Sequence, residues 1–262
     1  MPETITIVKI GGQILDHEKN LSGFCEQFIA LPGKKILVHG GGKLATALAE
    51  KLGIQQQMVN GRRVTDTETL KIVAMVYAGL INKQLVASLN SKGCISLGVC
   101  GADAQLITAH KRQHPTIEYG WVGDIDAVNQ QLLISWLTSG ITPVVAPITA
   151  DASGQLLNTN ADTIAAALAT ALSTHYRVQL VYAFEREGVL RDLGNPDSVI
   201  PLILPADYRE LLAQNIIADG MIPKLENAMD TLSKGVHKVV IGNALRLSDL
   251  VAGNAGTTLT NE

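Results

Sequence analysis

Residues 35–52 read KILVHGGGKLATALAEKL. The run Lys35–His39 is apolar enough for a buried strand, and Lys43–Leu52 has the apolar spacing of an amphipathic helix. The three glycines 40–42 join these two segments. Glycine lets the backbone approach a ligand closely, and the N–H groups at the start of a helix bind anions. The stretch therefore predicts a strand–turn–helix unit with an anion site at its turn.

The same alternation of short apolar runs and longer amphipathic stretches continues along the chain. The predicted strands are Ile5–Ile10, Lys35–His39, Ile95–Val99, Thr142–Ile148, Val178–Phe184 and Lys238–Ile241. The predicted helices are Glu18–Ala30, Lys43–Leu52, Asp66–Ser91, Ala127–Ser139, Ala161–Ser173, Ala206–Gln214 and Pro223–Lys234. Strands that are apolar throughout are typical of sheets covered on both faces. The pattern predicts an α/β sandwich with a mainly parallel sheet.

Two irregular segments, Met58–Val64 and Leu106–Val122, are expected to form hairpins or lids over one end of the sheet. A division near residue 175 separates two expected lobes, 1–174 and 175–262, of a single domain that spans 1–262.

Bulk composition excludes several classes of protein. The chain has 262 residues, of which 47% are hydrophobic and 17% charged, so a large core is expected and disorder is not. The net charge of −3 gives no basic surface for nucleic acid. No uninterrupted apolar run approaches the roughly 18 residues of a membrane span, and no signal segment precedes the first strand. Three cysteines without a CxxC pair predict reduced, buried thiols in a cytoplasmic protein.

A second glycine pair, Gly11-Gly12, follows the first predicted strand. Glycine turns after strands of a parallel sheet meet at one edge, where ligands bind. Known glycine-rich signatures do not fit, because GxxxxGK[ST] and GxGxxG are both absent. The HGGG sequence at 39–42 also occurs in esterases, but the chain has no GxSxG nucleophile. An anion-binding enzyme of another kind is therefore favoured over a hydrolase.

Four charged residues are candidates for the chemistry. Lys9 ends a buried strand beside Gly11-Gly12. Lys224 follows Pro223 at a predicted helix start, where its positive charge opposes the helix dipole unless an anion is bound there. Asp162 falls in the first turn of another helix, where ordinary capping or orientation of the two lysines are both open readings. Arg63 has two open interpretations. Its planar guanidinium could bind a carboxylate, or it could be an ordinary solvated charge on a hairpin. His39 is given no catalytic role.

The Asp66–Ser91 helix is apolar on more than one face. Such a helix must be covered on two sides. Either it lies centrally in its domain, or one side contacts a second copy of the chain.

The sequence indicates no dedicated metal site. The six histidines form no HxH or HExxH pattern. Mg²⁺ is instead expected to arrive with a nucleotide, held by phosphate and water oxygens.

A series of motifs resembles the amino-acid kinase superfamily and, within it, the acetylglutamate kinases. In chain order the motifs are Lys9-x-Gly11-Gly12, His39-Gly40-Gly41-Gly42, Asn60-Gly61-x-Arg63-Val64-Thr65, Gly98-x-x-Gly101-x-Asp103, Gly120-x-Val122-Gly123, Pro143-Val144-Val145-Ala146-Pro147, Asn158-x-Asn160-Ala161-Asp162, Asp219-Gly220-Met221-Ile222-x-Lys224 and Gly256-Thr257. They cover essentially the whole chain.

The resemblance implies a three-layer αβα sandwich around an eight-stranded, mainly parallel sheet. It implies that lobe 1–174 binds an N-acyl amino acid and lobe 175–262 binds MgATP. By the same resemblance, Lys9 and Lys224 flank the transferred phosphoryl group and Asp162 holds both lysines. The implied acceptor-binding residues are Gly41, Gly42, Arg63 and Asn158. The implied nucleotide-binding residues are Gly11, Gly12, Glu185, Gly188, Ile217, Asp219 and Met221.

Two features depart from the family. Phe184-Glu185-Arg186-Glu187-Gly188 stands where relatives commonly have Thr/Ser-Asp-Val-x-Gly, so Glu185 is expected to replace the Asp. The first strand also begins near Thr4, whereas arginine-inhibited members carry an additional N-terminal helix that builds hexamers. Feedback by arginine is therefore not expected.

The resemblance implies transfer of the ATP γ-phosphoryl group to the γ-carboxylate of N-acetyl-L-glutamate, a step of arginine biosynthesis. A carboxylate is already ionised at neutral pH, so no general base is needed. N-succinyl-L-glutamate, glutamate or aspartate remain open as acceptors, as does a relative that only binds ligand. A cytoplasmic homodimer, centred on the Asp66–Ser91 helix, is expected.

Overall fold

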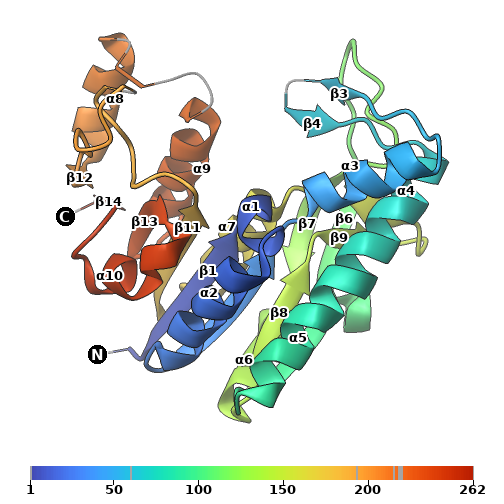
Figure 1. The fold of residues 1–262 in the computed structure, drawn as a ribbon, viewed down its shortest axis with the longest axis horizontal. Helices are drawn as coiled ribbons and strands as arrows, with labels where there is room; N and C mark the ends of the chain where they lie inside the picture. The colour runs from blue at the N-terminus through green and yellow to red at the C-terminus, as the bar shows by residue number, and fades with distance from the viewer. Residues whose placement is uncertain (1, 60, 193, 215, 218–220, 262) are drawn as a thin grey trace. The chain divides into compact units, whose positions relative to one another are not determined.

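The computed structural model describes residues 2–59, 61–192, 194–214, 216–217 and 221–261 (Figure 1). The chain divides into two compact units, Met1–Lys35 with Ala165–Glu262, and Ile36–Ile164. This division differs from the boundary expected between residues 174 and 175. The physical reason is strand pairing, because the N-terminal strand is hydrogen-bonded in parallel to a strand that begins at Arg177.

The first unit contains five strands of the main sheet among its described residues, in the order β12-β14-β13-β11-β1. Their bounds are β1 (Thr4–Ile10), β11 (Arg177–Phe184), β12 (Leu202–Ile203), β13 (Lys238–Asn243) and β14 (Thr257–Thr260). Pairs β1–β11 and β11–β13 are parallel, and β13–β14 is antiparallel. The side chains of Ile5, Ile7 and Ile10 in β1 are fully buried, which explains why this strand is apolar nearly throughout.

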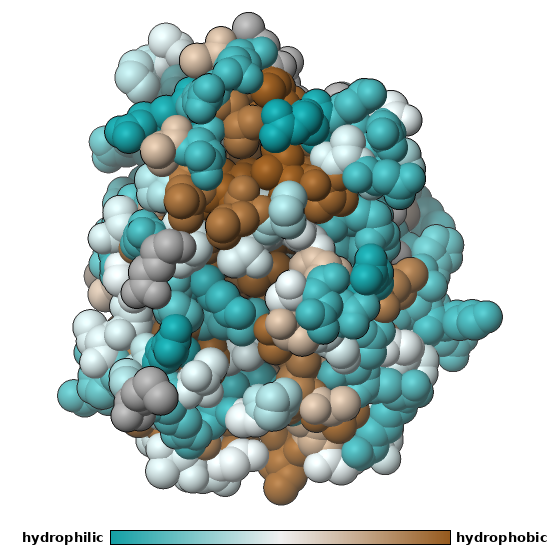
Figure 2. All heavy atoms as spheres, turned by 90° about the vertical axis from the view of Figure 1, so that its left-hand side faces the viewer, coloured by the Kyte–Doolittle hydropathy of each residue, from teal (hydrophilic) through white to brown (hydrophobic). Residues whose placement is uncertain are grey.

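Helices of the first unit follow its strands. They are α1 (Gly12–Leu15), α2 (Glu18–Ala30), α8 (Pro205–Ala213), α9 (Ile222–Ser233), η3 (Ala244–Arg246), α10 (Leu247–Ala252) and all but the first turn of α7 (Ala161–Leu172). Figure 2 shows the side with α8, β12 and α10: hydrophilic groups cover most of it, and apolar side chains gather in its upper part. Among the described residues of this unit, Leu202 and Leu245 are the large apolar side chains counted as exposed.

The second unit holds three parallel strands of the main sheet in the order β2-β8-β5, and a second sheet in the order β10-β9-β6-β7. The main-sheet strands are β2 (Lys34–His39), β5 (Ser96–Cys100) and β8 (Thr142–Ala146). The second sheet consists of β6 (Ile107–Lys111), β7 (Gly123–Val128), β9 (Ile148–Ala150) and β10 (Leu156–Asn158). A short hairpin pairs β3 (Met58–Val59) with β4 (Arg62–Arg63).

Helices of the second unit connect these strands. They are α3 (Gly42–Lys51), α4 (Thr67–Ala74), η1 (Met75–Ile81), α5 (Asn82–Ser91), η2 (Asp103–Gln105) and α6 (Gln130–Thr138). The predicted α/β class is confirmed, and the five and three main-sheet strands make the expected eight.

Several local predictions needed correction. The strand expected over Thr142–Ile148 is two strands that belong to different sheets, with Pro147 between them. Proline has no N–H to donate, so the ladder stops there. The helix expected from Ala127 begins at Gln130, because the side chain of Asn129 caps it by accepting the N–H of Leu132. The hairpin expected within Met58–Val64 is confirmed.

The segments α4, η1 and α5 form one helix over Thr67–Ser91, which Figure 1 shows as a long rod. Its centre, Met75–Ile81, has the wider π-helical turn. By length and composition alone this helix resembles a membrane span. Its apolar side chains Val73, Val76, Ile81, Leu85 and Leu89 are instead buried inside the second unit. Met75 and Leu80 remain 56% and 51% exposed, so the helix is only partly covered within its own chain.

A buried polar network joins this helix to the end of β2. The fully buried His39 ring places Nδ1 2.9 Å from the carbonyl of Gly40, and Nε2 3.2 Å from the amide nitrogen of Asn82. Because an amide nitrogen only donates, Nε2 accepts and Nδ1 carries the proton. Lys83 donates to the side-chain oxygen of Asn82 and to the carbonyl of Gly98. Both ring nitrogens of His39 are therefore satisfied by hydrogen bonds.

This network predicts a specific acid sensitivity. Burial lowers the pKa of His39 from 6.5 to about 4, and the charge of Lys83 acts in the same direction. The unfolded chain therefore binds a proton below pH 6.5 that the folded chain takes up only near pH 4, so stability falls as pH drops through this window. His39→Gln should reduce the loss of unfolding free energy between about pH 7.5 and about pH 5 by roughly 2 kcal/mol.

Urea titrations followed by tryptophan fluorescence measure this difference, since both tryptophans, Trp121 and Trp136, lie in the second unit. The comparison uses the pH dependence of each variant, so a general destabilisation by the substitution cancels. Identical pH dependence in the two proteins would show that His39 does not titrate in this way.

Candidate functional site

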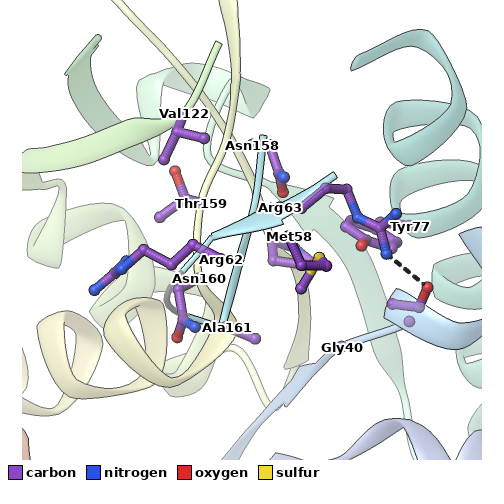
Figure 3. A pocket seen from close by; sticks show the side chains of 14 residues that line it. Gly40, Met58, Arg62, Arg63, Tyr77, Val122, Asn158, Thr159, Asn160 and Ala161 are labelled. Atoms are coloured by element: carbon purple, nitrogen blue, oxygen red, sulfur yellow. Dashed lines mark hydrogen bonds between the residues drawn. The ribbon is translucent and has the colours of Figure 1, made fainter. Parts of the chain in front are cut away.

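A cavity of about 200 Å³ lies in the second unit, beside the glycine turn that follows β2. Its walls come from the glycine turn, the β3–β4 hairpin, the π-helical segment and the segment that leads from β10 into α7 (Figure 3). The lining residues are Gly40, Gly41, Gly42, Met58, Gly61, Arg62, Arg63, Tyr77, Val122, Pro147, Asn158, Thr159, Asn160 and Ala161. The structure thus brings together all four residues expected to bind the acceptor, Gly41, Gly42, Arg63 and Asn158.

The glycine turn packs directly against the π-helical segment. Gly41 has φ of 156°, and a Cβ built on it would lie 2.4 Å from Cδ1 of Ile81 and 2.9 Å from Cδ1 of Tyr77. Any side chain at this position would displace the side chains of Ile81 and Tyr77. Helix α3 begins at Gly42, so its first N–H groups lie beside the cavity. The predicted strand–turn–helix unit is therefore present beside the cavity, and the binding of an anion at its turn stays a prediction.

Arg63 is held in place before any ligand binds. Its Nη2 donates to the carbonyl of Gly42 and to the hydroxyl of Thr46, both at 2.9 Å, and its Nη1 donates to the side-chain oxygen of Gln56. Gln56 in turn donates 3.1 Å to the hydroxyl of Thr69 in α4. Only 9% of Arg63 is exposed. A guanidinium has five N–H donors, so a fork fixed in this way retains donors for a carboxylate.

Asn158 and Asn160 fix the opposite wall. The amide of Asn158 donates 3.0 Å to the hydroxyl of Thr65, which itself donates to the carbonyl of Arg63. The side-chain oxygen of Asn160 accepts the backbone N–H groups of Asp162 and Thr163 at 2.8 and 3.1 Å, and so caps α7. The half-buried Asp162 is thereby placed in the first turn of that helix, as the sequence predicted.

Lys9 and Lys224 both lie in the first unit. Lys9 is half-buried in β1, and its register partner in β11 is Tyr182. Paired residues on neighbouring strands point to the same face of a sheet. The hydroxyl of Tyr182 accepts a 3.0 Å hydrogen bond from Asn227, which is three residues after Lys224 in α9 and so on the same side of that helix. The two lysines therefore lie on one side of the first unit's sheet.

Asp162 belongs to the second unit and the two lysines to the first. Its role as the residue that holds both lysines stays a prediction.

The expected nucleotide-binding residues have different environments. The N–H of Gly11 donates 3.1 Å to the carbonyl of Ala183, and Gly12 begins α1. Ile217 is buried, and Met221 directly precedes α9. Asp219 lies outside the described residues. A Cβ on Gly188 would lie 2.8 Å from the hydroxyl oxygen of Thr257, so close packing by itself requires glycine there.

The segment Phe184–Gly188 departs from the family pattern, and its two glutamates differ. Glu185 is exposed and makes no hydrogen bond with any residue that the structure describes. Glu187 accepts a 2.6 Å hydrogen bond from the amide of Asn243 and contacts Arg246. The replacement of the usual Asp by Glu185 therefore stays a prediction.

Sequence reasoning missed several lining residues. Tyr77 gave no signal because it reads as one of many apolar positions in a long helix. Arg62 could have been noticed, since it stands next to Arg63 in the hairpin, and neighbours on a strand point to opposite faces.

Comparison with known proteins identifies the family of this chain. The model of the amino acid kinase family matches residues 4–243. The chain belongs to the amino acid kinase family. Proteins named acetylglutamate kinase from Phocaeicola vulgatus and Cytophaga hutchinsonii are both 50% identical to it, over 95% of this chain and 97% of that protein, and over 98% of each, respectively.

Solved structures agree on the fold. A Streptococcus mutans protein superposes with a TM-score of 0.76 at 29% identity, and the match covers 98% of this chain and 99% of that one. Carbamate kinase from Giardia lamblia, bound to AMP-PNP, gives a TM-score of 0.71 at 13% identity, with 99% of each chain covered. At that identity the likeness shows the fold alone.

The hydrogen bonds around Arg63 predict a role for Gln56. Gln56→Leu keeps a side chain of similar size but removes an acceptor of Arg63, so the guanidinium should lose its fixed orientation. We expect affinity for N-acetyl-L-glutamate, the ligand in the relatives' name, to fall about tenfold by calorimetry. ATP affinity should change less than about twofold, because the contacts of Gln56 lie around the cavity that is expected to bind the acceptor and not the nucleotide.

Gln57→Leu is the matched control, since the side chain of Gln57 is exposed and makes no hydrogen bond with described residues. Equal affinities in the two variants would contradict a positioning role for Gln56.

Proposed function

We propose that this protein is an ATP-dependent acetylglutamate kinase that transfers the γ-phosphoryl group of ATP to the γ-carboxylate of N-acetyl-L-glutamate in arginine biosynthesis. The observation that carries the proposal is the cavity in which the fixed fork of Arg63, the amide of Asn158 and the glycine turn at the start of α3 converge. Relatives named acetylglutamate kinase, at 50% identity over nearly the whole chain, support it.

The cavity suits a small acid with two carboxylates. Arg63 would bind the α-carboxylate through its remaining donors, and Asn158 would position the N-acyl amide. The γ-carboxylate would then lie at the glycine turn, where the N–H groups of α3 stabilise negative charge. Because that carboxylate is ionised, it attacks the phosphoryl group without a general base.

Catalysis then consists of positioning and charge neutralisation, since two anions must approach each other. Lys9 and Lys224 would neutralise the charge that develops on the transferred group, and Asp162 would orient the two ammonium groups. In this proposal the first unit, with its lysines, holds the nucleotide and the second unit holds the acceptor.

Mg²⁺ enters the proposal as the ion that accompanies ATP and offsets the charge of its phosphates. Among the described residues no group of three His, Cys, Asp or Glu side chains is placed to hold a metal ion. An ion that arrives with ATP would be ligated mainly by phosphate and water oxygens.

A cytoplasmic location is part of the same proposal. The thiols of Cys25, Cys94 and Cys100 are all buried and are not joined in disulfides. Unpaired cysteines are typical of proteins in a reducing compartment.

A coupled assay of ADP release tests the function directly. Purified protein with MgATP is offered N-acetyl-L-glutamate, N-succinyl-L-glutamate and unmodified glutamate in parallel. Turnover that depends on an N-acylated glutamate supports phosphoryl transfer to the γ-carboxylate, and turnover with N-acetyl-L-glutamate supports that acceptor. Turnover with none of the three overturns the proposal.

Lys224 should act mainly in the transition state. Lys224→Ala is expected to lower kcat by about 10²–10³ while KM for both substrates changes little, because an electrostatic contact to developing charge is lost. Steady-state kinetics measure both parameters. Lys234→Ala, at the residue that directly follows the same helix and whose exposed ammonium pairs with Asp230, is the control and should behave as wild type. A kcat for Lys224→Ala within about threefold of wild type would remove Lys224 from the phosphoryl site.

The chain is further proposed to form a homodimer through the long helix Thr67–Ser91. Met75 and Leu80 on this helix are exposed, and β5 is an edge strand of its sheet with Leu97 37% exposed. An unpaired edge beside exposed apolar side chains is a surface that proteins normally cover. A second copy would cover both features in one two-fold symmetric contact.

Light scattering at micromolar concentration should give about twice the chain mass of 27.8 kDa. Leu80→Glu with Met75→Glu should shift the protein to monomer, because two carboxylates would be buried at the contact. Val76 is unsuitable for this test, since it is only 3% exposed and a charge there would disturb the unit itself. Leu245→Glu, at an exposed site of the first unit, is the control. A monomeric wild-type protein would contradict the dimer.

A further inference from the structure

The cavity has a second guanidinium that the proposed reaction does not use. Arg62 lines the cavity together with Arg63, and the two residues form strand β4. Neighbouring residues on a strand point to opposite faces. Figure 3 shows the consequence: Arg63 extends toward Tyr77 and the glycine turn, whereas Arg62 extends in the other direction, past Asn160. The cavity therefore has a cation on each of two sides.

Arg62 differs from Arg63 in its partners. The side chain of Arg63 donates three hydrogen bonds within the protein, whereas the side chain of Arg62 makes no hydrogen bond or ion pair with any described residue. The nearby carboxylate of Asp124 is already engaged by Arg112, whose Nε lies 3.1 and 3.0 Å from its two oxygens. Partial burial lowers the pKa of Arg62, and the charge of Arg112 acts in the same direction. Arg62 is thus a partly desolvated cation, and the carboxylate of Asp124, whose charge acts on it, is hydrogen-bonded to another arginine.

The charge of the cavity indicates what could satisfy Arg62. None of its described lining residues is acidic, and two are arginines. In the proposed complex Arg63 takes the α-carboxylate, and the γ-carboxylate lies at the glycine turn to accept the phosphoryl group. An N-acetyl group ends in a methyl and offers Arg62 nothing. An N-acyl group that ends in a carboxylate would supply the third anion at the position where a guanidinium is available.

We propose that Arg62 is a specificity-determining residue that binds a carboxylate at the end of the N-acyl group, so that the preferred acceptor is an N-dicarboxylacyl-glutamate such as N-succinyl-L-glutamate. The inference rests on the proposed function. It keeps the phosphoryl transfer to the γ-carboxylate and changes only the acyl group.

The first test compares acceptors in the wild-type enzyme. We expect kcat/KM for N-succinyl-L-glutamate to exceed that for N-acetyl-L-glutamate about 10- to 100-fold, the usual effect of one hydrogen-bonded charge contact. Calorimetry with each acceptor alone should give the same ratio of affinities. A preference for N-acetyl-L-glutamate would overturn the inference.

Variants then assign the preference to Arg62. Arg62→Leu should lower kcat/KM for the succinyl acceptor at least about tenfold further than for the acetyl acceptor, and Arg62→Lys should restore part of the difference because it keeps the charge. Arg209→Leu, at an exposed arginine of α8, is the matched control and should keep the wild-type ratio. Equal losses with both acceptors would make Arg62 a general contributor to the site and overturn its role in specificity.

The two proposals fail in different ways. If no N-acylated glutamate is phosphorylated, the proposed function fails, and the calorimetric ratio still decides the role of Arg62. If N-acetyl-L-glutamate is the preferred acceptor and is phosphorylated, the function holds and the inference about Arg62 fails.

Discussion

The close approach of Gly41 to the π-helical segment is the constraint on which the cavity depends. A Cβ on Gly41 would lie 2.4 Å from Cδ1 of Ile81 and 2.9 Å from Cδ1 of Tyr77, so a larger residue would displace these two side chains. The φ of 156° is also one that residues with a side chain rarely adopt. The contact sets the start of α3 beside the cavity, and the carbonyl of Gly42 then anchors Arg63. A π-helical turn is less common than an α-helical one and often occurs at functional sites. Here it places Tyr77 in the cavity wall.

Buried hydrogen bonds hold the end of β2, which leads into the glycine turn, against the long helix. His39 is held neutral between the carbonyl of Gly40 and the amide of Asn82, and Asn82 also donates to the carbonyl of Val144 in β8. The last strand residue, the long helix and the neighbouring strand are therefore joined by one set of satisfied polar groups. Because an unsatisfied buried polar group is costly, such a network favours a single arrangement of the turn. The same logic holds for Arg63, whose partners fix its direction in advance of ligand binding.

Much of this site was predictable from sequence. Glycine after an apolar strand, followed by a helical pattern, has few structural uses, and it predicts the turn at Gly41 and Gly42 that lines the cavity. Arg63 and Asn158 came from the family resemblance, and both line the cavity. Tyr77 and the anchoring roles of Gln56 and Thr46 were not predictable, because these contacts join residues that local patterns do not relate. The break at Pro147 was missed since two consecutive buried strands and one long strand look alike in an apolar run.

The sequence by itself determined the alternation of strands and helices, the positions of the glycine turns and the family, because these depend on local periodicity and on motifs contained in short segments. Only the tertiary structure decided that the first strand pairs with β11 and so groups residues 1–35 with the C-terminal part of the chain. Only it separated the roles of two adjacent arginines, one anchored by three hydrogen bonds and the other facing the cavity without one. The physical reason is that hydrogen-bond partners and burial are set by segments distant in sequence, which meet only when the chain has folded.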